Sequence, residues 1–78
     1  MEITITQETK ENGSHYIEAT CGKTSAFVGR GASGYITVCC MNASHRAWRG
    51  AGRTFFTVDA AIKSYKKAEM KAIIGLLS

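Results

Sequence analysis

Proline is missing from the chain, and no apolar run approaches the roughly 18 to 20 residues that a helix needs to cross a bilayer. The first residues, MEITITQETKENG, alternate polar and apolar side chains instead of forming a basic and then apolar secretion signal. The sequence therefore predicts a cytoplasmic protein that does not enter a membrane. The missing proline also leaves the expected helix uninterrupted.

Cysteine is scarce as well: Cys21, Cys39 and Cys40 are an odd number, and two of them are adjacent. At least one thiol stays unpaired in any disulfide scheme, which favours a reducing compartment. Together with His45 these residues have the ligand types of a zinc site, but neighbours in a strand point to opposite faces and no C-x-x-C motif is present. We therefore expect no metal and no cofactor.

A catalytic constellation is also hard to assemble. Nucleophilic catalysis needs a thiol or hydroxyl, a base and an orienting acid within reach of one another. Cys40 and His45 are the one conceivable pair of nucleophile and base, and no carboxylate lies in the segment around them. The sequence predicts a binding protein rather than an enzyme.

Acidic residues are absent from Ala19 to Val58, a segment that contains Lys23 and four arginines. The first 18 residues, in contrast, hold four glutamates and one lysine, although the whole chain carries a net charge of +4. A long stretch of one charge sign raises encounter rates with polyanions and with acidic protein surfaces.

One domain spanning residues 1–78 is expected, because a chain this short cannot support two cores. Period-two alternation and turn signals such as Asn12-Gly13 divide residues 1–56 into strands. The expected strands are 1–8, 15–20, 24–28, 35–41 and 54–56, with a loop at 42–53. We expect an α+β fold: an antiparallel meander sheet of four to five strands, with one C-terminal amphipathic helix packed on one face.

From Thr57 the apolar period changes to about 3.6, which predicts a helix over residues 57–77 with Thr57 as its N-cap. Glu69 falls inside the apolar stripe, where a bare carboxylate is costly to bury. We expect a basic partner from the sheet, or a side chain that extends outward. A secondary basic face is predicted from the lysines of the outer helix face and the second turn: Lys23, Lys63, Lys67 and Lys71.

The C-terminal end of this helix is apolar around more than half of its circumference, because Met70, Ile74 and Leu77 widen the stripe. Either this end is deeply buried, or the three residues form a patch that meets another protein or a second copy of the chain. Monomer and homodimer therefore both remain open.

Gly29, Gly31 and Gly34 match the pattern G-x-G-x-x-G, which binds dinucleotide phosphates when it follows a strand and opens a helix. Here the residues that follow are typical of a strand, so no helix N-terminus is available to the phosphate. The segment is interpreted as a connection between strands that carries Arg30.

The segment from Ser44 to Arg53 has the strongest functional signal, with three arginines around Trp48. The guanidinium of arginine has several N–H donors in one plane, which can bind a carboxylate or a phosphate with two hydrogen bonds. Arginine and tryptophan are both enriched at interface hot spots. Alternatively, Trp48 folds back over the sheet and the arginines are solvated. The predicted partner-binding residues are Arg30, His45, Arg46, Trp48, Arg49 and Arg53.

Two classes of partner fit this composition. One is a protein with an acidic surface, and the other is a nucleic acid whose phosphates contact the same basic residues. The seven aromatic residues are few, and several are needed for the core, so no stacking platform for single strands is expected.

A chain of this size that begins with a strand meander and ends in FFTVDAAIKSYKKAEMKAIIGLL resembles small proteins encoded by bacteriophages and mobile elements, anti-CRISPR proteins among them. Many anti-CRISPR proteins are acidic mimics of nucleic acid, and this basic chain departs from that pattern. The resemblance implies a cytoplasmic inhibitor in a bacterial host cell. Such an inhibitor would mask a surface of a CRISPR-Cas protein or ribonucleoprotein complex without catalysis.

Overall fold

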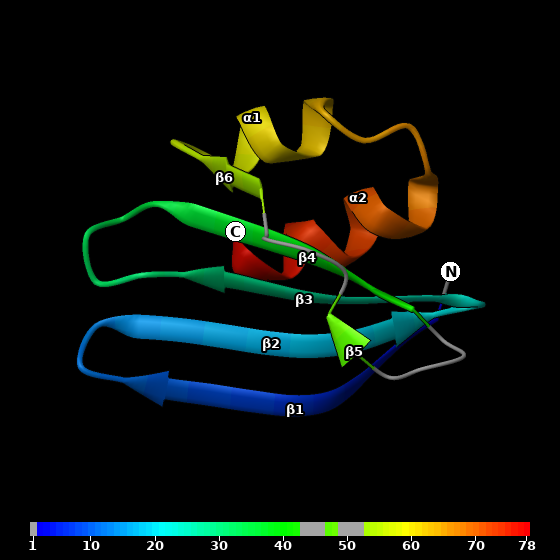
Figure 1. The fold of residues 1–78 in the computed structure, drawn as a ribbon, viewed down its shortest axis with the longest axis horizontal. Helices are drawn as coiled ribbons and strands as arrows, with labels where there is room; N and C mark the ends of the chain where they lie inside the picture. The colour runs from blue at the N-terminus through cyan, green and yellow to red at the C-terminus, as the bar shows by residue number, and fades with distance from the viewer. Residues whose placement is uncertain (1, 43–46, 49–52) are drawn as a thin grey trace.

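The computed structural model describes residues 2–42, 47–48 and 53–78, with the side chains of 40–42 and 47–48 excepted. The predicted α+β fold is confirmed, with an antiparallel sheet followed by helices on one of its faces (Figure 1). In chain order the elements are β1 (Ile3–Glu11), β2 (Ser14–Cys21), β3 (Thr24–Arg30), β4 (Ile36–Asn42), β5 (Ala47–Trp48), β6 (Arg53–Phe55), α1 (Val58–Lys63), α2 (Ala68–Ile74) and the 3-10 turn η1 (Gly75–Leu77).

The first four strands form the predicted meander, in which each strand pairs antiparallel with the next. Both short strands pair with β4: β6 with its first half, and β5 with its last residues. The pairing of β5 corrects the prediction of a loop over residues 42–53, because a two-residue strand is too short to produce a period-two pattern.

The tight turns agree with the glycine and asparagine signals. Asn12 and Gly13 have φ angles of 49° and 83°, and Gly22 has a φ of 64°. These left-handed conformations are accessible to glycine and asparagine at low cost, so each turn closes a hairpin without strain.

The core lies between the sheet and the helices. Alternate residues of β2, β3 and β4 point to the same side of the sheet, called here the helix side, and meet the apolar residues of the helices. The buried apolar residues on the two layers are Ile17, Ala19, Cys21, Ala26, Val28, Ile36, Val38, Ala61, Met70, Ile73, Ile74 and Leu77.

The helical segment is divided, whereas the sequence predicts one helix over residues 57–77. Thr57 caps α1 as expected, since its hydroxyl accepts a hydrogen bond from the amide of Ala60 at 3.0 Å. The helix ends at Lys63, and the extended backbone of Lys67, with a ψ of 130°, starts α2 in a new direction. The break lets α1 pack on β4 and β6 while α2 packs on β2 and β3, which one straight helix would not do.

The apolar patch at the end of the helical segment is a core element. Met70, Ile74 and Leu77 are only 3%, 0% and 2% exposed. The three side chains are therefore buried in the core, and they do not form the alternative, an exposed patch for an oligomer or a partner. The division of the helix turns these side chains onto the sheet. No helix in the described residues is long and apolar enough to span a membrane.

The division of the helical segment also places Glu69 near the start of a helix. It lies half-buried in the first turn of α2, where the positive end of the helix dipole favours a carboxylate. The described residues provide no ion-pair partner for it, so the expected basic partner from the sheet is not found.

Candidate functional site

Arg53 is the one predicted partner-binding residue whose described side chain lies exposed beside the helical layer. Its guanidinium carbon lies 5.1 Å from the ring centre of Phe55 and 5.4 Å from that of Tyr65. The two rings contact each other edge to face, with their centres 6.2 Å apart. The rings hold the cation at the surface by cation–π attraction, worth about 0.5–1 kcal/mol per contact at exposed sites.

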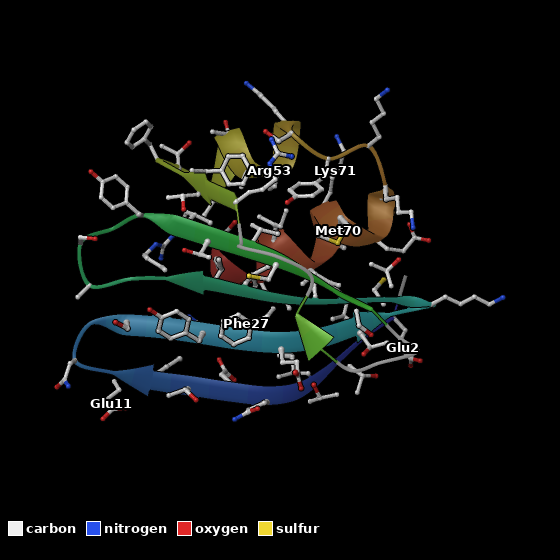
Figure 2. All side chains as sticks on the ribbon, in the orientation of Figure 1. Glu2, Glu11, Phe27, Arg53, Met70 and Lys71 are labelled. Carbon is white, nitrogen blue, oxygen red and sulfur yellow. The ribbon has the colours of Figure 1, made fainter. Side chains whose placement is uncertain are left out.

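Four lysines lie exposed on the helical segment that contributes Tyr65. They come from the end of α1, the connection at residues 64–67 and the outer side of α2, and with Arg53 they form a set that we call the basic surface. Its members are Arg53, Lys63, Lys66, Lys67 and Lys71. Figure 2 shows Arg53 and Lys71 on the part of the molecule where β6 and the helices lie.

The basic surface is poorly neutralised. Asp59 and Glu69 are its acidic neighbours on the helical segment, and within the described residues none of the five cations makes an ion pair. Like charges that are not neutralised repel one another in the unbound protein, and a partner of opposite sign relieves that repulsion.

The far edge of the sheet is mainly acidic, with Lys10 as the one basic residue of β1. Glu8 and Glu11 lie in β1, Glu2 directly precedes it, and Glu18 lies in the neighbouring strand β2. In Figure 2, Glu11 lies at the β1 edge and Arg53 at the β6 edge. The molecule is therefore bipolar, with an acidic and a basic edge separated by the width of the sheet.

The structure separates the residues predicted to bind a partner. Arg30 is half-buried at the end of β3, and Lys23 is exposed in the turn between β2 and β3. The backbone of Trp48 pairs with that of Met41 in β4, and the Trp48 side chain is not among those that the structure describes. The predicted residues His45, Arg46 and Arg49 also lie outside the described residues.

Two exposed aromatic residues were missed by sequence reasoning. Tyr35 precedes β4 and Phe56 follows β6, and their rings contact each other with centres 5.4 Å apart. They are 48% and 79% exposed. The sequence places Phe56 in a strand over residues 54–56, whereas β6 ends at Phe55 and Phe56 lies outside the core.

The glycine-rich segment connects β3 to β4, as predicted, but Arg30 is the last residue of β3 and does not belong to the connection. Gly29 belongs to β3, and the amide of Gly31 donates to the carbonyl of Tyr35 at 3.0 Å. Gly34 has a φ of 96° and its amide donates to the carbonyl of Gly31. The segment leads into β4 and not into a helix, so the geometry of a dinucleotide site is missing.

Comparison of the chain with protein-family models, with curated proteins and with solved structures finds no match.

Proposed function

We propose that this chain is a non-catalytic binding protein that engages an acidic surface of another protein through its basic surface. The observation that carries the proposal is the placement of Arg53, fixed over two rings beside exposed lysines and without a neutralising carboxylate in the described residues. A cation that is already ordered loses less conformational entropy when it binds a carboxylate.

A protein partner fits this geometry better than a nucleic acid. Arg53 lies over the rings of Phe55 and Tyr65, so a base could stack in its place only by displacing the guanidinium. The acidic β1 edge would repel a long polyanion that continued past the basic surface, whereas a compact acidic protein can approach one side of a bipolar molecule. The exposed pair of Tyr35 and Phe56 adds the apolar contacts that are typical of protein interfaces.

The resemblance to anti-CRISPR proteins narrows this proposal to an inhibitor that masks part of a CRISPR-Cas complex in the cytoplasm of a bacterial host. A small domain that binds tightly can block a larger assembly by occupying its surface, and no chemistry is required. The finer hypothesis depends on the resemblance, while the basic surface supports the broader one.

Capture from nuclease-treated bacterial lysate tests the proposal. Immobilised wild-type chain is compared with the variant R53Q/K67Q/K71Q, and captured proteins are identified and then titrated as purified partners. The matched control is K10Q/K23Q/R30Q, which removes the same charge outside the basic surface. We expect the basic-surface variant to bind a captured acidic protein at least about tenfold more weakly than wild type.

Equal affinities for both variants and the wild type would contradict the proposal. A further variant, R46A/W48A/R49A, examines the predicted loop, and a loss confined to it would move the contact to that segment. Retention that disappears with nuclease, together with oligonucleotide affinity that falls steeply between about 50 and 200 mM salt, would identify nucleic acid as the partner instead.

A further inference from the structure

A row of three nitrogen-bearing side chains crosses the first three strands, away from the basic surface. The pairing register places Lys10 of β1 opposite His15 of β2, and His15 opposite Arg30 of β3. Cross-strand partners share a side of the sheet, so all three side chains project from the same side. The row lies near the turns at residues 12–13 and 31–34, which Figure 1 shows at one end of the molecule.

The row lies at the border of the core. In the neighbouring row, Ile17 and Val28 are 2% and 0% exposed. In contrast, Lys10 is exposed, while His15 and Arg30 are half-buried. His15 and Arg30 are therefore partly covered beside this apolar row, and Lys10 reaches the solvent.

One carboxylate partly neutralises the row. Glu8 Oε2 lies 2.6 Å from Nε2 of His15, while Lys10 and Arg30 make no ion pair within the described residues. Neighbouring strands are separated by about 5 Å, so the ends of the long Lys10 and Arg30 side chains can meet above the shorter imidazole. The register therefore allows both cations to reach an oxyanion placed above the imidazole.

We propose that Lys10, His15 and Arg30 form a binding site for a phosphate-type oxyanion. The ammonium, imidazole and guanidinium groups supply N–H donors from three directions, which matches a tetrahedral group with several acceptor oxygens better than a single carboxylate. Glu8 competes with the ligand for His15, so it lowers the affinity of the site.

The proposed site consists of side chains, because the backbone of the glycine-rich turn has no amides available for an anion at Gly31 and Gly34. The amides of Gly31 and Gly34 donate to backbone carbonyls within the turn and are not available to an anion. The site is therefore unlike a glycine-rich phosphate loop, and it is independent of the function proposed for the basic surface.

Titration of the isotope-labelled chain with inorganic phosphate, followed by amide and imidazole NMR signals at fixed pH, tests the inference. Parallel titrations with sodium acetate and with sodium chloride, matched in ionic strength, distinguish phosphate from carboxylate and from a general salt effect. We expect saturable shifts at residues 10, 15 and 30 with phosphate, and non-saturating changes with chloride.

Variants that remove single charges or pairs of charges test whether these residues form the phosphate site. K10Q/R30Q should weaken phosphate binding by at least about tenfold, while K23Q, which removes a lysine from the opposite end of the hairpin, should leave it unchanged. E8Q should strengthen binding, and E11Q is its matched control because Glu11 pairs with Ser14 on the other side of the sheet.

The inference is overturned if phosphate shifts are not saturable, if they match those of chloride, or if K23Q weakens binding as much as K10Q/R30Q. If acetate binds saturably with equal affinity, the proposal of a phosphate-type ligand is wrong and the site binds carboxylates instead. None of these results bears on the basic surface, whose test depends on Arg53, Lys67 and Lys71 and uses a protein partner.

Discussion

Tyr16 lies across the backbone of Gly29 and stacks on Phe27, with ring centres 5.7 Å apart and planes inclined by 10°. A β-carbon built on Gly29 would overlap the Tyr16 ring, and its three nearest neighbours all belong to that ring. At the residue scale, Gly29 is therefore required because an aromatic neighbour occupies the space of its missing side chain.

The G29A substitution should destabilise the fold by about 1–3 kcal/mol, because the Tyr16 ring must leave its place on Phe27. Urea unfolding measures the change. The control is G75A, at a glycine with helical φ and ψ and with no atom close to its added β-carbon, which should be neutral or slightly stabilising. In a Y16A background the cost of G29A should largely disappear, and an unchanged cost would show that the ring is not its cause.

At the scale of elements, the division of the helical segment decides what each part covers. The hydroxyl of Ser64 donates to the carbonyl of Ala60 at 3.1 Å, where α1 ends. Such local bonds offer the backbone an alternative to continued helix. The connection then exposes Lys66 and Lys67 and directs Tyr65 onto Phe55, which positions Arg53.

The T57A substitution removes the side-chain cap of α1 and should cost about 1 kcal/mol of stability. T57S keeps the hydroxyl acceptor and should retain most of the stability. Chemical denaturation compares the three proteins. A T57A protein as stable as wild type would show that the cap does not contribute in this short helix.

At the scale of the whole molecule, one apolar layer joins the sheet to the helices, and the two charged edges lie outside it. No charged side chain is buried among the described residues, and in Figure 2 Glu11 and Arg53 lie at opposite edges of the sheet. The glutamates of the first 18 residues lie in or beside β1 and β2, while the lysines and arginines other than Lys10 come later in the chain. The order of the strands therefore separates the two kinds of charge in space as well as in sequence.

The I74A substitution should destabilise the protein by about 2–5 kcal/mol, since Ile74 is fully buried between α2 and the sheet. I5A provides the matched control, because Ile5 in the edge strand is 45% exposed and should lose much less. Thermal or urea unfolding gives both values. An I74A protein of unchanged stability but altered oligomeric state would favour the surface patch that the structure excludes.

The amino-acid sequence alone determined the antiparallel strands, the Asn12-Gly13 turn, the Thr57 cap and the separation of charge. These features depend on neighbours a few residues apart, and their periodicity or turn chemistry is visible locally. Only the tertiary structure decided that the helix divides, that Arg53 rests on Phe55 and Tyr65, and that Lys10, His15 and Arg30 form a row. These arrangements depend on strand register and helix packing, which join residues distant in sequence and leave no periodic signal in it.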